Sequence, residues 1–167
     1  MQEQRPQLTL HRGFEDYGQY TWSAFVNKLE LRLRLGNYPY TAAAGLPLKG
    51  PKGKIPWVEL QYKDGTKLSL GDSDLIVKQL VKDGHLDELP SRADPHTRAQ
   101  DVMMRSMLED RLYFFDQREK WFDHFYLERD KILWPFSYPM NIVVGSIVYR
   151  IMSVSYTHLT LPTNREV

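Results

Sequence analysis

The sequence contains no cysteine. Disulfides, thiolate metal sites, thiol nucleophiles and dithiol redox chemistry are therefore excluded for this chain. An excess of one charge sign is also lacking, because 22 Lys and Arg stand against 21 Asp and Glu, for a net charge of +1. Without a basic field over the whole surface, we expect no nucleic-acid partner and no recruitment to an anionic membrane by charge alone.

Signals for export, membrane spanning and common catalytic classes are missing as well. Residues 1–7 lack the basic and apolar regions of a secretory signal, so a cytosolic protein is expected. The most apolar run, residues 140–152, reaches about thirteen residues, short of the ~20 that a spanning helix needs, and predicts a buried or groove-lining helix. No Gly-rich phosphate loop, His-Glu-x-x-His or Gly-x-Ser-x-Gly occurs. His124 and Glu128 lie one turn apart without a third ligand at suitable spacing, so no metal site is expected.

Alternating apolar residues at 7–11 predict a first strand. Residues 22–36 fit two patterns, because their second half alternates as a strand does while their apolar positions also recur at helical spacing. Helix formers dominate and β-branched residues are nearly absent, which favours a helix. Ser23 is the candidate N-cap of this helix, and Gly36 is the candidate glycine just past its end.

The next elements complete a small α/β unit. Residues 38–41 predict a strand at a sheet edge, where Pro39 is tolerated. Residues 42–54, with three lysines, predict a solvated loop. Residues 56–70 predict a hairpin around Asp64-Gly65, and an Asp-Ser pair opens a helix over residues 72–83.

The second half of the chain is expected to be helical. Residues 96–133 contain no Pro or Gly and carry apolar side chains at helical spacing, which predicts one long helix or two abutting ones. We therefore expect a first domain at 1–88, a linker at 89–95 and a helical domain at 96–154. Residues 155–167 share no periodicity with what precedes them and are interpreted as an extraneous tail.

A family resemblance rests on Lys-Gly-Lys-Ile-Pro-Trp-Val-Glu at 52–59, followed by Asp72-Ser73. This pattern resembles the second half of a glutathione transferase N-terminal domain. The resemblance implies a thioredoxin-like α/β domain, a mixed four-stranded sheet with helices, followed by an incomplete all-α C-terminal domain of the same superfamily. Residues 8–11, 23–30 and 35–40 most resemble the metaxin and failed-axon-connections branch, particularly its fungal members.

The resemblance also implies a glutathione site. In the family, the residue before a cis-proline hydrogen-bonds the glutathione backbone, and an acidic-Ser pair at the next helix holds the γ-glutamyl end. The matching positions are Ile55-Pro56 and Asp72-Ser73, with Lys54 beside them. From the residues alone, capping explains the Asp-Ser pair equally well, although free N–H groups and the helix dipole at this point favour an anion.

Ser23 stands where the family places a hydroxyl that hydrogen-bonds the glutathione thiolate, and Tyr17 and Tyr20 are alternatives. A simple helix cap is the competing interpretation of Ser23. The metaxin-like branch usually has Ser-Pro-Phe-Cys here, whereas residues 23–26 read Ser-Ala-Phe-Val, so cysteine chemistry is absent.

Two functions follow from the resemblance. The first is a glutathione transferase-like protein that binds glutathione as a substrate and conjugates it to a small electrophile. The second is a non-catalytic, metaxin-like adaptor that uses the same fold for protein contacts at the cytosolic face of a membrane, such as the mitochondrial outer membrane. For the full-length form, the family implies a homodimer.

Overall fold

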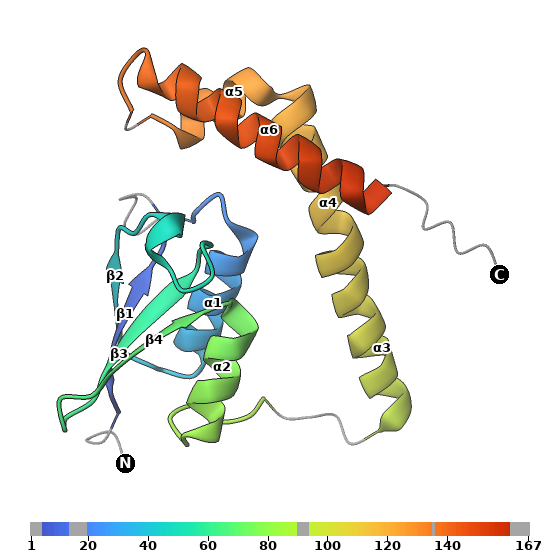
Figure 1. Cartoon of the computed structure of the whole chain (residues 1–167). Helices are drawn as coiled ribbons and strands as arrows, with labels where there is room; N and C mark the ends of the chain where they lie inside the picture. Colours follow the sequence, from blue (N-terminus) through green and yellow to red (C-terminus); the bar gives the residue numbers. More distant parts are fainter. Residues whose placement is uncertain (1–4, 14–19, 90–93, 135, 161–167) are drawn as a thin grey trace. The chain divides into compact units, whose positions relative to one another are not determined.

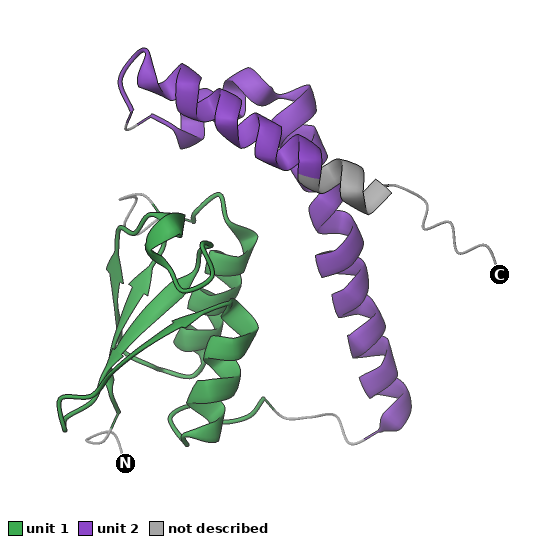
Figure 2. Cartoon of the chain, in the orientation of Figure 1, with its two compact units in different colours: residues 1–90 green, residues 91–167 purple. Residues whose placement is uncertain are grey.

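The computed structural model describes residues 5–13, 20–89, 94–134 and 136–160. The chain divides into two compact units, unit 1 at residues 1–90 and unit 2 at residues 91–167 (Figure 2). Within the described ranges, no helix is both long enough and apolar enough to cross a membrane.

Unit 1 is an α/β unit built on one mixed sheet. Its elements in chain order are β1 (Gln7–His11), α1 (Ala24–Leu35), β2 (Tyr40–Ala43), the short 3₁₀ helix η2 (Pro47–Lys49), β3 (Trp57–Gln61), β4 (Lys67–Gly71) and α2 (Ser73–Lys82). The strand order is β2-β1-β3-β4, with β1 and β2 parallel and the other pairs antiparallel. This is the thioredoxin-like four-stranded sheet that was predicted, and Figure 1 shows α1 and α2 on the same face of it.

The core lies between that face and the two helices. Strand residues that point inward alternate with outward ones, as the period of two requires. Each fully buried aliphatic side chain contributes about 1.5–3 kcal/mol to this packing. The core residues are Leu8, Leu10, Leu29, Leu33, Tyr38, Val58, Leu60, Ile76, Leu80 and Leu86.

The ambiguous segment at 22–36 is a helix, with Ser23 as its N-cap. Its end differs from the prediction by one residue. Asn37, with φ 46°, takes the left-handed conformation, whereas Gly36 has φ −87°. Gly36 is needed for space instead, because a Cβ at this position would overlap Leu86 Cδ2.

Strand β2 begins at Tyr40, two residues later than predicted. The Tyr38 N–H donates to Leu33 O (2.9 Å) and closes the end of α1, so it is not available to the sheet. Pro39 has no N–H to donate. The prediction that this strand lies at the sheet edge is confirmed.

The predicted hairpin is present, but its loop has three residues. Tyr62 N–H donates to Thr66 O (2.9 Å), and Gly65 takes φ 87° within the loop. A three-residue hairpin loop requires one residue in this left-handed region, and glycine supplies it without a steric penalty.

Within the described residues, the regular elements of unit 2 are all helices. Its elements are α3 (Pro95–Ser106), the π-helical stretch η3 (Met107–Leu112), α4 (Tyr113–Arg118), a second π-helical stretch η4 (Glu119–Asp123), α5 (Phe125–Ile132) and α6 (Met140–Thr160). The first four run on as one helix, and His124 (φ −121°, ψ 31°) separates it from α5. Two abutting helices, one of the predicted alternatives, are therefore observed.

Helix α6 is longer and more exposed than predicted. It extends to Thr160 rather than ending near residue 152, so it includes the first residues of the segment interpreted as a tail, while 161–167 lie outside the described residues. It packs on α5 at Gly145, where a Cβ would come within 2.8 Å of Arg129 Cγ. Its large apolar side chains are mostly exposed rather than buried: Met140, Ile142, Val143, Ile147, Tyr149, Ile151 and Val154.

Candidate functional site

One end of the unit 1 sheet gathers the predicted site residues. Strand register aligns Ala43, His11, Trp57 and Gly71 across the four strands. The loop that leads to α1 follows His11, and α2 begins just after Gly71. The N-termini of both helices therefore lie at the same end of the unit (Figure 1).

Pro56 and Asp72 meet at this end. The Ile55-Pro56 peptide bond is cis, as the resemblance implies. Pro56 is fully buried, and its carbonyl oxygen accepts a hydrogen bond from the Asp72 N–H at 3.3 Å. The strand entry and the start of α2 are thus joined directly.

Asp72 adopts an unusual backbone conformation to cap α2. Its φ of 83° lies in a region that residues with a Cβ seldom occupy. Its Oδ1 accepts from the Asp74 N–H at 3.0 Å, and its Oδ2 lies 3.3 Å from Lys52 Nζ. Partial burial works against ionisation of Asp72, but hydrogen bonds from the Asp74 N–H and the Lys52 ammonium outweigh it and lower the pKa of this carboxyl.

Ser73 and Ile55 leave polar groups unused at the same point. Ser73 is the first residue of α2 and is only 5% exposed, yet its N–H and its hydroxyl form no hydrogen bond with any described residue. The Ile55 backbone likewise has no hydrogen-bond partner among the residues described. Lys54, in the loop just before, is exposed. These donors, with the positive end of the α2 dipole, suit a carboxylate ligand.

Ser23 is held as a helix cap and is not in contact with that group. Its Oγ accepts from the Val26 N–H at 3.4 Å, and its N–H donates to Thr21 Oγ1 at 3.2 Å. The two helix N-termini are linked instead by Lys28 Nζ, 2.8 Å from Asp74 Oδ1. Ser23 therefore shares the end of the unit with Asp72 without a direct hydrogen bond among the described residues.

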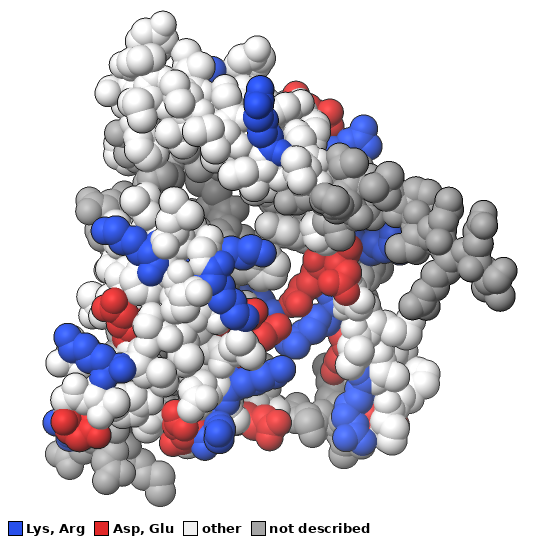
Figure 3. All heavy atoms as spheres, in the orientation of Figure 1, with Lys and Arg blue, Asp and Glu red and all other residues white. Residues whose placement is uncertain are grey.

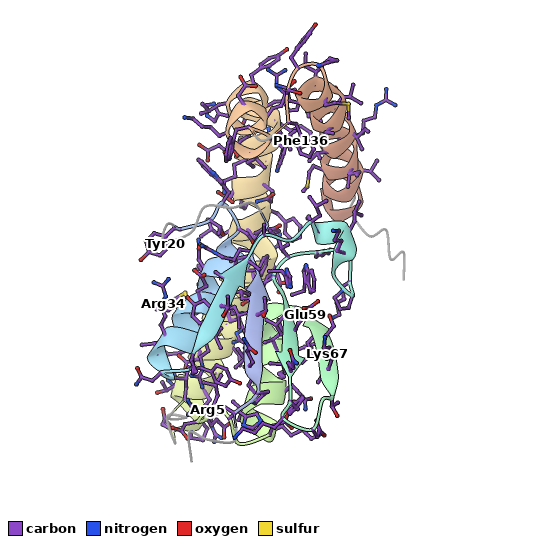
Figure 4. The ribbon with its side chains drawn as sticks, turned by 90° about the vertical axis from the view of Figure 1, so that its left-hand side faces the viewer. Arg5, Tyr20, Arg34, Glu59, Lys67 and Phe136 are labelled. Atoms are coloured by element: carbon purple, nitrogen blue, oxygen red, sulfur yellow. The ribbon has the colours of Figure 1, made fainter. Side chains whose placement is uncertain are left out.

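Of the alternative hydroxyls, Tyr17 lies outside the described residues. Tyr20 is 84% exposed, and Figure 4 labels it near the start of α1. An exposed phenol lacks the packing that would fix it against a bound thiolate.

Lys52 is the site residue that sequence reasoning missed. It was grouped with Lys49 and Lys54 as a solvated loop, but it reaches over Gly71 to pair with Asp72. Gly53, which lies among the three lysines, takes φ 62°. A glycine at this point is the sequence feature that could have indicated a turn, which brings Lys52 back toward the sheet.

The same loop is fixed against the sheet by an aromatic pair. The rings of His11 and Trp57 stack with centroids 3.5 Å apart and an interplanar angle of 6°. His11 Nδ1 lies 3.2 Å from Ala44 O. A Cβ at Gly45 would come within 2.7 Å of His11, and one at Gly50 within 2.7 Å of Trp57. Both glycines therefore allow the loop to lie directly on the stacked rings.

A buried ion pair supports the loop that leads to α1. Arg12 Nε lies 3.0 Å from Glu30 Oε1, and both side chains are at least 95% buried. Arg34 adds a longer contact, 3.7 Å from the other carboxylate oxygen. Glu30 alternates with leucines in the sequence of α1, and that pattern gave no indication that a charged residue at this position is buried.

Charged groups elsewhere form no obvious centre. In Figure 3, basic and acidic side chains are interspersed over the face of unit 1 in view, while the sequence of α6 carries Arg150 as its single charged residue. Among the described residues, no group of three His, Asp or Glu is placed to hold a metal ion. Glu128, one turn from His124, is buried, and burial raises the pKa of its carboxyl.

Comparison with known families gives one match. The family model described as "Glutathione S-transferase N-terminal domain" matches residues 24–125. The matched range contains Lys54, Ile55, Pro56, Asp72 and Ser73, and it begins one residue after Ser23. No curated protein matches the chain significantly.

Proposed function

Because the chain belongs to the glutathione S-transferase N-terminal domain family, we propose that unit 1 binds glutathione at the end of its sheet, through Ile55, Asp72 and Ser73. The observation that carries the proposal is the set of unused donors at the start of α2. A ligand that carries a carboxylate and an ammonium on one carbon can bind both the Ser73 donors and the Asp72 carboxylate. The γ-glutamyl end of glutathione is such a group.

The γ-glutamyl carboxylate binds to the Ser73 N–H and hydroxyl. Both lack a partner among the described residues, and both lie at the positive end of α2. The γ-glutamyl ammonium binds to the Asp72 carboxylate, which is ionised at neutral pH because its pKa is lowered. The two charges of the ligand thus meet opposite charges on neighbouring residues.

The cysteinyl part of glutathione pairs with the backbone of Ile55 in the manner of an added strand. The exposed side chain of Lys54 faces solvent in the loop just before it and binds the glycyl carboxylate.

Lys52 pairs with Asp72 in the free protein and is displaced when the ligand binds. In the free protein its ammonium lies 3.3 Å from Asp72 Oδ2, where the ligand's ammonium is to bind. Both side chains are about half exposed, so their ion pair is weak and easily exchanged. The displaced Lys52 is then free to contact a carboxylate of the same ligand.

Ser23 is the residue proposed for conjugation. Its Oγ accepts from the Val26 N–H, which leaves the hydroxyl hydrogen to donate to a thiolate near the N-terminus of α1. The thiol proton passes to solvent, the sulfur forms a bond to an electrophilic carbon, and the displaced electron pair leaves with the departing group.

Retention on immobilised glutathione tests the binding step. We expect the folded chain to be retained and to elute with free glutathione, and we expect Asp72→Ala to pass through. Asp64→Ala is the matched control, because Asp64 also caps a backbone N–H but lies in the distant hairpin turn. Equal retention of both variants would contradict the proposed site.

A metaxin-like adaptor is the second candidate function. One observation in its favour is Val26, which stands where that branch usually has cysteine, because cysteine chemistry is then absent. A second is the set of large apolar side chains exposed on unit 2, which suit protein contacts. A folded chain that neither binds glutathione nor conjugates a chlorodinitrobenzene-type electrophile supports this function. The cytosol, or the cytosolic face of a membrane, is the proposed location for either.

A further inference from the structure

Among the described residues of unit 1, no α-helix covers the second face of the sheet (Figure 1). Both α1 and α2 lie on the opposite face, and the connection from β2 to β3 contains only η2, at Pro47–Lys49 (Figure 1). The strands therefore present their outward side chains to solvent over most of this face, which is turned toward the viewer in Figure 4.

Strand register arranges those outward side chains in rows. Glu59 on β3 is opposite Ser69 on β4, and Gln61 is opposite Lys67. One acid, one amide, one ammonium and one hydroxyl thus occupy the four corners of a square on two rigid strands. Figure 4 labels Glu59 and Lys67, the two charged corners, on this open face.

A shallow cavity of about 260 Å³ lies over the square. This volume is slightly below the range of drug-sized sites, so it suits a small metabolite. The cavity is lined by Gln7, Thr9, Glu59, Leu60, Gln61, Lys67, Leu68 and Ser69.

The charges in this cavity are not paired with each other. Among the described residues, Lys67 forms no ion pair, and the contact of Glu59 is with the His11 ring, whose Nε2 lies 3.8 Å from Glu59 Oε2. Glu59 and Lys67 occupy diagonal positions on adjacent strands, where Cα atoms are about 7–8 Å apart. A small ligand with both charges therefore fits between the two side chains.

We propose that this square binds the zwitterionic end of a free α-amino acid. Glu59 and the carbonyl oxygen of Gln61 accept from the ligand's ammonium, and Lys67 and the Ser69 hydroxyl donate to its carboxylate. The charge balance carries the choice of ligand, because one carboxylate and one ammonium that are not paired with each other complement a group with one charge of each sign.

This site is separate from the proposed glutathione site. Glu59 and Ser69, the corners nearest to it, lie three residues from Pro56 and from Asp72 along the chain, a distance of about 10 Å at ~3.3 Å per residue. Amino-acid binding at the square therefore does not depend on Asp72, and its success or failure is independent of the proposed function.

Amide chemical shifts of the full chain, titrated with alanine and with glutamine, test the proposal. We expect shifts centred on residues 59–61 and 67–69 in the wild type and in Asp72→Ala alike. N-acetylalanine and alanine methyl ester, which each lack one charge, should bind at least about tenfold more weakly.

Glu59→Gln and Lys67→Met should each weaken amino-acid binding by about tenfold or more, while Lys63→Met, in the hairpin turn outside the cavity, leaves it unchanged. Ser69→Ala gives a neutral third variant in case a charge change alters folding. An absence of shifts at these residues, shifts confined to residues 72–73, or equal affinity in Glu59→Gln and the wild type would overturn the proposal.

Discussion

Replacing Asp72 with glycine should remove glutathione binding with little change in the free energy of unfolding, whereas alanine should remove binding and also destabilise the fold. Asp72 is the N-cap of α2, holds φ at 83° and pairs with Lys52. Its substitutions therefore change a cap, a strained backbone and an ion pair at once. Both variants lose the ion pair, and they differ in the backbone strain and in how much of the cap is lost.

The magnitudes follow from the structure. Glycine relieves a positive φ that costs about 1 kcal/mol or more. It gives up a few tenths of a kcal/mol of capping relative to Asp, about 0.2–1 kcal/mol from the exposed pair with Lys52, and about 0.5–1 kcal/mol of unfolded-chain entropy. These contributions nearly cancel, so the free energy of unfolding of Asp72→Gly should stay within about 1 kcal/mol of the wild type.

Alanine keeps the strained φ and cannot cap. The loss of the cap costs about 1 kcal/mol, and the loss of the pair with Lys52 adds a smaller amount, so Asp72→Ala should be destabilised by about 1–2 kcal/mol. Urea unfolding measures both variants, and calorimetric titration with glutathione measures their affinity.

Two results would refute this reasoning separately. Wild-type affinity for glutathione in Asp72→Gly would remove the carboxylate from the binding site. A glycine variant less stable than the alanine variant would show that the positive φ carries no strain. Asp64→Gly, in the hairpin turn, controls for the general effect of an Asp-to-Gly change.

The remaining predictions concern a cap, a buried ion pair and a buried phenol. Ser23→Ala should lose about 1 kcal/mol in urea unfolding, while Ser23→Asp restores the cap but not conjugation, because a carboxylate cannot donate to a thiolate; equal conjugation by all three proteins would rule out the hydroxyl as donor. Arg12→Met removes the closer of the two arginines that contact the buried Glu30 carboxylate and should cost up to about 3–5 kcal/mol, most of which the added change Glu30→Met recovers; additive losses would contradict this coupling. Burial raises the pKa of Tyr38 to about 12 from 10.0, so the folded state favours the neutral phenol, and the resulting stability is complete below pH 10 and is lost as the pH rises toward 12. Tyr38→Phe should flatten that part of the stability profile, and an unchanged slope would refute the assignment.

The sequence predicted the elements of unit 1 well, because local chemistry decides most of them. The cap at Ser23, the Asp-Gly turn and the Asp-Ser helix start act within a few residues. Where prediction failed, a contact that the local sequence pattern does not encode intervened. Tyr38 is not in a strand because its N–H donates to Leu33 O, and Gly36 is required because a Cβ would overlap Leu86, not because of its φ.

The candidate site was predicted in part for the same reason. Asp72 and Ser73 are adjacent in sequence, so one motif found both. Lys52 reaches Asp72 across Gly71, a contact between segments twenty residues apart that no local pattern encodes. The open face of the sheet also escaped prediction, because the alternation of a strand shows which side chains share a face but not whether anything covers that face.

The two π-helical stretches of unit 2 change the directions in which the side chains that follow them on the same helix point. Each closes its turn with an i→i+5 bond instead of i→i+4 and so takes up an extra residue. Side chains of α4, and then of α5, are consequently rotated about the helix axis from where uninterrupted α-helical counting puts them. An apolar stripe drawn through Met104, Leu108, Phe115 and Phe122 by spacing alone crosses both stretches, so these side chains do not share one straight line on the helix surface.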